Sequence, residues 1–247
     1  MSQFIRVERR DSCLEIVLDR PDKKNAVLTD MYEAMTRALE ESLRDPSISS
    51  VLFRGEGPAF CAGNDLKDFV QTPPTGPESP VMRFLATAAR HPLPMIAAVH
   101  GAAVGIGTTL LLHCDFAYAA TGTVFSMPFV PLGVVPEAGS SLLIPRRLGR
   151  RMASELLLLG RRFSPDEAKD AGLINGVHDP EAVLDVARAT ATKLGALPQR
   201  ALRTSKQLIL EAEATSLHQA MDREGEAFVE ALNGEEFHAA IRAFFKR

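Results

Sequence analysis

The sequence predicts an α/β fold, because segments typical of strands alternate with segments typical of helices up to about residue 178. Beyond Pro180 the strand patterns end, and four helical stretches are expected at about 180–195, 199–212, 215–232 and 235–245. Strands separated by helices favour parallel pairing in a shared sheet. The chain has 247 residues, 46% hydrophobic and 24% charged, which is typical of a globular protein with a sizeable core.

The N-terminal region is expected to open the sheet with a hairpin. Residues 4–9 and 14–19 alternate apolar and polar positions around a short polar turn. A helix should follow, capped by Thr29 or Asp30 and ended at Asp45 and Pro46.

The middle of the chain continues the alternation. ISSVLFRG at 48–55 predicts a strand, and QTPPTGPESP at 71–80 predicts a mobile surface loop that could close over a ligand. A short helix near 83–90 and the buried strand MIAAV at 95–99 should follow. Further on, FSPDEAKDAGLI at 163–174 predicts a helix with a capping box and a glycine stop.

The last predicted helix carries four apolar residues, which need a surface to cover them. The surface is either the helix's own core or a neighbouring subunit. These residues are Phe237, Ile241, Phe244 and Phe245.

Composition argues against several classes of protein. A net charge of −3 does not indicate a nucleic-acid binder. Cys13, Cys61 and Cys114 are widely separated, which fits a reducing compartment, and we expect a cytoplasmic protein. Residues 95–112 are the most apolar stretch, but their glycines and His100 favour a buried strand, turn and helix over a membrane span. The histidines show no metal-ligand spacing, so no metal site is expected.

Two glycine-containing turns are candidates for binding through the backbone. FCAGNDL at 60–66 follows a strand and its loop, and HGAAVGIGTTL at 100–110 runs from a strand into a helix. Glycine permits close approach, and the first N–H groups of a helix have no partner within it. Two such donors from separate turns could bind one oxygen atom as an oxyanion hole.

Glu137 in VVPEAGSSL is the only charged residue between 116 and 145. Its neighbours are mostly apolar, so we expect it to be poorly solvated. The local pattern is equally compatible with a carboxylate at the start of a helix and with a catalytic base.

Taken together, FCAGNDL, HGAAVGIGTTLLLHCDFAYA and MPFVPLGVVPEAGSS resemble the crotonase family of enoyl-CoA hydratases and isomerases. LDRPDKKNAV and DEAKDAGLINGV extend the resemblance over nearly the whole chain. The resemblance implies a crotonase-like spiral of ββα units over residues 1–190 and a helical trimerisation region over 191–247. It also implies an acyl-coenzyme A thioester as substrate, a role in fatty acid metabolism, a homotrimer or dimer of trimers, and no separate cofactor.

The resemblance assigns the two oxyanion donors to the backbone N–H groups of Asn64 and Ile106. Hydratases of the family use two glutamates to activate water, but the corresponding positions here hold Thr109 and Phe129. The carboxylate is instead at Glu137, as in Δ3,Δ2-enoyl-CoA isomerases of the peroxisomal type. We therefore expect Glu137 to move a proton between C2 and C4 of a 3-enoyl thioester.

Two alternatives remain at this point. The chain could be a hydratase or another CoA-thioester enzyme that uses Glu137 differently, including one acting on ring-derived thioesters. It could also be a non-catalytic protein that binds acyl-CoA through the same two glycine turns.

Binding residues are also carried over from the family by position. The coenzyme A contacts would be Lys24, Ala26, Ala62, Gly63, Asp65 and Leu66, with Lys246 and Arg247 as weaker candidates. Lys24 would pair with a phosphate, whereas Asp65 is more simply explained as a helix cap. The acyl pocket would be lined by Phe84, Phe129 and Leu132.

Overall fold

The computed structural model describes residues 2–246 and contains one principal sheet, with strand order β1-β2-β3-β4-β6-β8. Its strands are β1 Ile5–Arg10, β2 Cys13–Leu18, β3 Ser50–Gly55, β4 Met95–Val99, β6 Phe116–Ala120 and β8 Gly176–His178. β1 and β2 form the expected antiparallel hairpin, and the other pairs are parallel. β5 Ala102–Val104 and β7 Val124–Ser126 form a second, parallel pair. The α/β prediction with parallel pairing is confirmed.

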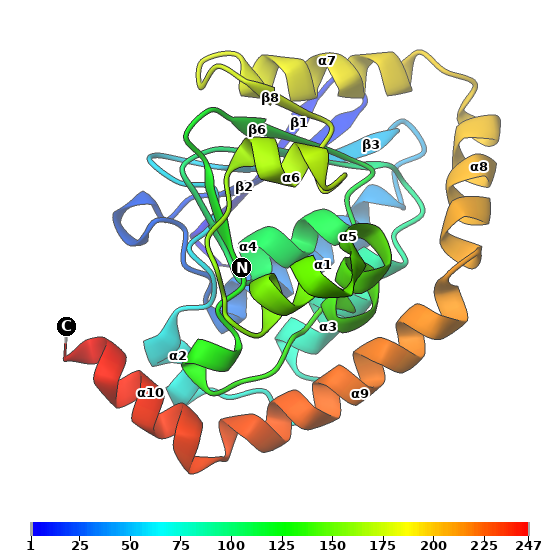
Figure 1. Ribbon diagram of the computed structural model, residues 1–247. Helices are drawn as coiled ribbons and strands as arrows, with labels where there is room; N and C mark the ends of the chain where they lie inside the picture. The colour runs from blue at the N-terminus through cyan, green and yellow to red at the C-terminus, as the bar shows by residue number, and fades with distance from the viewer. Residues whose placement is uncertain (1, 247) are drawn as a thin grey trace.

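The helices lie on both faces of the sheet and extend beyond it. They are α1 Thr29–Ser42, α2 Leu66–Gln71, α3 Pro80–Ala89, α4 Ile106–Thr109, α5 Ser140–Leu157, α6 Pro165–Asp170, α7 Val183–Gly195, α8 Gln199–Glu211, α9 Ala214–Leu232 and α10 Glu235–Phe245. Figure 1 shows α7 lying across the sheet, while α8, α9 and α10 form an arm that curves around the other helices. The four C-terminal helices match the predicted stretches closely.

Helix α7 covers one face of the sheet. Its Ala187, Ala191 and Leu194 pack on Leu52 of β3 and Ile96 of β4. The larger core lies on the opposite face, which α1, α3 and α4 cover. The predicted boundary at 190/191 falls within α7, because this helix continues to Gly195.

Helix α7 is also held to the sheet by charge. Arg188 donates to the buried Glu15 of β2 at 2.7 Å, and Arg54 of β3 pairs with the same carboxylate at 2.9 Å.

The start of α1 differs from the prediction. The N-cap residue is Leu28, and Thr29 is already the first helical residue. Asp68 of α2 supplies the missing acceptor, since its carboxylate receives the backbone N–H and the hydroxyl of Thr29, both at 2.8 Å. The cap was assigned wrongly because the acceptor comes from a helix that lies far along the chain.

The segment after α2 is a loop from residue 72 to 79, in agreement with the proline-rich pattern, and α3 begins at Pro80, earlier than predicted. In the last helix, Phe237 and Ile241 are buried in the chain's own core, whereas Phe244 and Phe245 are about half exposed. No helix within residues 2–246 is long and apolar enough to cross a membrane.

Candidate active site

The two glycine turns lie directly against each other. Cys61 and Ala103 form a parallel bridge, with hydrogen bonds from Cys61 N–H to Ala102 and from Val104 N–H to Cys61. A Cβ atom added at Gly107 would lie 2.7 Å from the Cys61 carbonyl oxygen, closer than real Cβ contacts. The lack of a side chain at this position lets the first turn of α4 approach the neighbouring loop.

Each turn presents a backbone N–H without a partner. Among residues 2–246, neither Asn64 nor Ile106 donates a backbone hydrogen bond, although their neighbours Asp65 and Gly105 do. Ile106 is the first residue of α4, so its N–H has no acceptor within the helix. Two free donors from adjoining turns can bind an oxygen atom that gains negative charge.

Glu137 lies beside these turns in an apolar setting. Its side chain is only 4% exposed, and Thr109 of α4 donates a hydrogen bond to its Oε1 at 2.8 Å. Thr109 is one helical turn after Ile106, so the Glu137 carboxylate is hydrogen-bonded to the same short helix whose first residue carries the second free N–H. Tyr32 of α1 donates its hydroxyl hydrogen bond to the side-chain Oδ1 of Asn64.

Burial changes the acidity of this carboxylate. It raises the pKa of Glu137 from 4.5 to about 7, with the hydrogen bond from Thr109 opposing the rise and the charge of Glu224 adding to it. Burial also raises the pKa of Tyr32 well above its usual value, and the charge of Glu137 contributes. A carboxyl group that titrates near neutral pH can both accept and return a proton.

The backbone after Glu137 has an uncommon conformation. Ala138 and Gly139 both have positive φ, 59° and 71°, and only the second is a glycine. The buried His113 contacts the Ala138 carbonyl oxygen at 2.9 Å through Nε2, which must carry the hydrogen because a carbonyl only accepts. Burial lowers the pKa of His113 to about 4, so it is neutral at pH 7. A strained turn held by buried groups is frequent at functional sites.

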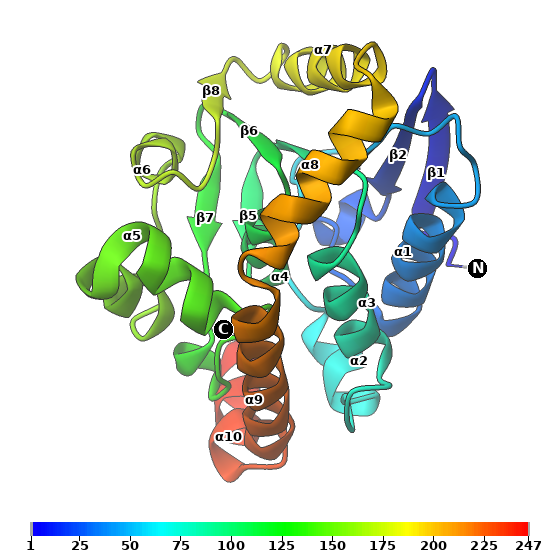
Figure 2. The same ribbon diagram turned by 90° about the vertical axis from the view of Figure 1, so that its right-hand side faces the viewer.

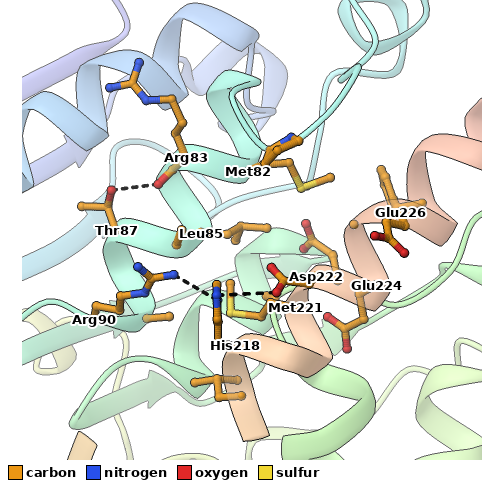
Figure 3. Close-up of a pocket in the computed structure, with 18 of the residues that line it drawn as sticks. Met82, Arg83, Leu85, Thr87, Arg90, His218, Met221, Asp222, Glu224 and Glu226 are labelled. Carbon is orange, nitrogen blue, oxygen red and sulfur yellow. Dashed lines mark hydrogen bonds and ion pairs between the residues drawn. The ribbon is translucent and has the colours of Figure 1, made fainter. Parts of the chain in front are cut away.

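A cavity of about 1140 Å³ opens beside Glu137, between α3 and α9. Figure 3 shows side chains from both helices facing this space, and Arg90, directly after α3, reaches His218 of α9 across it, at 3.1 Å. The loop at 72–79 contributes four residues, Thr75, Gly76, Pro77 and Glu78.

The three residues expected to line an acyl pocket are not in the lining of this cavity. Phe84 is fully buried against Tyr32 and Phe53, Phe129 is buried in the same core, and Leu132 packs against it. None of the three lines the cavity beside Glu137. In the structure all three contribute to core packing.

The positions proposed for coenzyme A do come together. Ala62 donates its N–H to the Lys24 carbonyl oxygen, and Val27 donates to Gly63, so the opening loop lies along the first glycine turn. Lys24 is exposed, and Ala26, Ala62 and Leu66 are partly exposed. This surface can receive a polar ligand at the edge of the site.

Asp65 is a helix cap, as predicted. Its side chain accepts from the N–H groups of Lys67 and Asp68, and it pairs with Arg20 at 2.7 Å. Lys246 is exposed after α10, whereas Arg247 lies outside the described residues. Within residues 2–246 no group of three or more His, Cys, Asp or Glu side chains is arranged to hold a metal ion.

Sequence reasoning missed three side chains around Glu137: Tyr32, His113 and Glu224. Each lies far from residue 137 in the sequence, and no local motif marks it. Thr109 was noticed only as the residue that replaces a hydratase glutamate.

Comparison with known proteins adds an independent line of evidence. A family model described as enoyl-CoA hydratase/isomerase matches residues 8–247. The chain is 33% identical to 1,2-epoxyphenylacetyl-CoA isomerase of Escherichia coli, over all of this chain and 97% of that protein. It is 37% identical to human enoyl-CoA delta isomerase 2, over 86% of this chain but only 55% of the human protein. A solved structure of Pseudomonas aeruginosa OdaA has 43% identity, full coverage of both chains and a TM-score of 0.97.

Proposed function

The chain belongs to the enoyl-CoA hydratase/isomerase family, and within this family we propose that it is a Δ3,Δ2-enoyl-CoA isomerase with Glu137 as its base. The observation that carries the proposal is the buried carboxylate, whose pKa is raised to about 7, beside two free backbone N–H groups. The crotonase fold and an acyl-CoA thioester substrate follow from family membership. The direction of the double-bond shift is the proposed part.

In the proposed reaction, ionised Glu137 removes a proton from C2 of a 3-enoyl thioester. The C–H bonding electrons form the C1=C2 bond of a dienolate, and the thioester oxygen becomes negative. Protonated Glu137 then returns the proton to C4. The C3=C4 π electrons form the new C4–H bond, the C1=C2 π electrons shift to C2=C3, and the oxygen lone pair re-forms the carbonyl. Thr109 holds Oε1, so Oε2 is the oxygen that we assign to proton transfer. These steps need no redox or metal cofactor.

The oxyanion is assigned to the N–H groups of Asn64 and Ile106. Removing one such donor typically lowers kcat by about 10²–10³. A proton-transfer group typically contributes about 10²–10⁴. The burial of Glu137 limits its contact with water, which should reduce competing protonation of the dienolate.

Hydration of a 2-enoyl thioester is less well supported. Thr109 and Phe129 occupy the positions of the two hydratase glutamates, and Phe129 is buried in the core. Glu224 is a second buried carboxylate, but both of its oxygens already accept backbone hydrogen bonds. Glu224 is therefore not free to orient water beside Glu137.

Coenzyme A is assigned to the surface between the opening loop and the first glycine turn. Lys24 offers a cation for a phosphate, while the backbone at Ala26, Ala62, Gly63 and Leu66 can receive the pantetheine arm. The acyl chain is assigned to the cavity between α3 and α9, since Glu137 contributes to its lining.

The direct test follows conjugation of cis- or trans-3-hexenoyl-CoA by 2-enoyl thioester absorbance. We expect rapid conversion by the wild-type protein, a loss of about 10²–10⁴ in kcat for Glu137→Gln, and negligible hydration of crotonyl-CoA. Hydration as fast as conjugation, or a fully active variant, would contradict the proposal. Binding of acyl-CoA in a thermal-shift assay without turnover of any substrate would indicate a non-catalytic binder.

A ring-derived thioester is the second candidate substrate. The specific reason is the similarity over the whole chain to the relative named 1,2-epoxyphenylacetyl-CoA isomerase. The large cavity beside Glu137 has room for a ring. The test substrate is 1,2-epoxyphenylacetyl-CoA. If the protein isomerises it with a higher kcat/KM than 3-hexenoyl-CoA, the ring-derived substrate is the better assignment.

We further propose a homotrimer or a dimer of trimers in the cytoplasm. Large apolar side chains are exposed on the C-terminal arm, with Leu208 63% and Ile209 67% exposed on α8. The three cysteines are unpaired, which agrees with a reducing compartment. Sedimentation velocity would show a trimer or hexamer, and a monomer at micromolar concentration would contradict the assembly.

A further inference from the structure

A buried carboxylate from the C-terminal arm contacts the loop that carries Glu137. Glu224 of α9 is 7% exposed, and its Oε2 accepts the Gly139 N–H at 2.6 Å. Its Oε1 accepts the Ser141 N–H at 2.8 Å. One side chain thus fixes two backbone groups that lie two and four residues after the proposed base. Figure 3 shows Glu224 on α9 among the side chains that face the cavity.

The loop held in this way requires external support. Ala138 has a positive φ, which residues with a side chain rarely adopt, and Gly139 continues in the same conformation. His113 holds the carbonyl oxygen of Ala138 from the core. Glu224 holds the N–H groups on the other side, where α5 begins. An anion at this position also interacts favourably with the N-terminus of the helix.

We propose that Glu224 is a positioning residue for the reaction: its carboxylate holds the turn at 138–141, so that Glu137 is directed at the substrate. This inference depends on the proposed role of Glu137 as the base. Helix α9 would then supply a residue that positions the base, in addition to any role in assembly. Glu224 does not act as a second base, because both of its oxygens are already hydrogen-bonded to backbone.

The charge of Glu224 gives this role a distinctive effect on pH dependence. The polar and titratable groups around Glu137 are Tyr32 of α1, Cys61 of the first glycine turn, Thr109 of α4 and Glu224 of α9. Among them Glu224 raises the pKa of Glu137 as a like charge, and Arg223 is the cation that acts on Glu224 itself. Removing the Glu224 charge should therefore lower the pKa of Glu137, while burial continues to hold it above 4.5.

The test compares Glu224→Gln, Glu224→Asp and the matched control Glu230→Gln. Glu230 is an exposed residue of the same helix and does not line the cavity. For 3-hexenoyl-CoA we expect Glu224→Gln to lower kcat at least tenfold, to change KM less than threefold, and to move the acid limb of kcat/KM to lower pH. Glu224→Asp keeps the charge but reaches less far, so it should retain the wild-type limb with an intermediate kcat. Glu230→Gln should match the wild type.

A role in folding alone would give a different pattern. It would reduce the melting temperature and the active fraction of Glu224→Gln without moving the acid limb, and this result would overturn the proposal. A wild-type kcat with an unchanged limb would overturn it equally. If Glu224→Gln does not fold, Glu224→Asp is decided by kcat per folded molecule. A lowered kcat with a wild-type folded fraction supports the positioning role, and a wild-type kcat overturns it.

A second readout separates this inference from the proposed function. The titration of Glu137 can be followed without substrate by carboxyl ¹³C NMR, with its resonance assigned from Glu137→Gln. If the wild type converts no substrate but Glu224→Gln lowers the Glu137 pKa, the isomerase assignment fails and the coupling between the residues stands. If the wild type is active and neither Glu224 variant changes kcat or the Glu137 titration, only the positioning role fails.

Discussion

At the scale of single residues, the structure places a carboxylate where its charged form is poorly solvated. Glu137 is held by one hydrogen bond from Thr109, and no cation pairs with it among residues 2–246. An isolated buried carboxylate lowers the stability of the fold at neutral pH. Such a cost is common where a residue serves the reaction instead of the fold.

The first prediction concerns pH dependence. The base must be ionised to remove a proton, and the pKa of Glu137 is raised to about 7. We therefore expect kcat/KM to rise with pH through an apparent pKa near 7 and to level off above it. A pH profile with 3-hexenoyl-CoA measures this limb. A limb near pH 4.5 would mean that the base is a solvated carboxylate.

The second prediction concerns stability. The folded protein binds the Glu137 proton more tightly than the unfolded chain, because the folded pKa of about 7 exceeds the ordinary value of 4.5. The energetic cost of ionisation is thus absent below about pH 4.5 and complete above pH 7. Glu137→Gln should be more stable than the wild type by on the order of 2–3 kcal/mol at pH 8.5. Urea denaturation should show no such difference at pH 4.5.

At the scale of elements, the site depends on the close approach of two turns. Gly107 lies in the first turn of α4 and faces the backbone of Cys61. Because Gly107 does not have a positive φ, alanine there meets only a steric conflict and no backbone strain. This makes it a selective probe of the distance between the two candidate donors.

We expect Gly107→Ala to lower kcat by about 10²-fold or more, since the backbone of one turn must shift and misplaced donors lose most of their effect. The control is Gly172→Ala at the end of α6, where φ is 70° and the space is open. It should cost about 1 kcal/mol of stability without affecting kcat. Steady-state kinetics and thermal melts of both variants test this, and equal kcat values would contradict the role of the close approach.

The elements that were predicted well have local determinants. The capping box of α6 is formed by Ser164 and Glu167, both within the same four residues, and the structure contains it as expected.

The N-cap of α1 was assigned wrongly because Asp68 supplies the acceptor from α2. Glu224 acts on the loop at 139–141 from more than eighty residues away, so no local pattern could reveal it. An apolar pocket residue and a core residue have the same sequence pattern, so the sequence could not show that Phe84 packs in the core.

At the scale of the whole molecule, the C-terminal arm has to be fixed to the sheet for α9 to reach the site. Figure 2 shows α8 leading from α7 toward α9 past the central helices. Its attachment includes one buried ion pair, in which Lys206 of α8 contacts Asp115 at 2.6 Å. Asp115 also accepts the backbone N–H of Met95 at the start of β4. A single carboxylate therefore links the sheet to the arm.

The last prediction tests this link. Lys206→Met leaves Asp115 without its cation, and removal of one partner from a buried pair is destabilising, so we expect the free energy of unfolding to fall by about 2–4 kcal/mol. Asp115→Asn keeps an acceptor for Met95 but removes the charge, so the double variant should recover part of the loss. Urea denaturation at fixed protein concentration gives the coupling energy, which we expect to be about 1–3 kcal/mol. Strict additivity of the two single variants would mean that the Lys206–Asp115 pair does not hold the arm, and that the position of Glu224 does not depend on this ion pair.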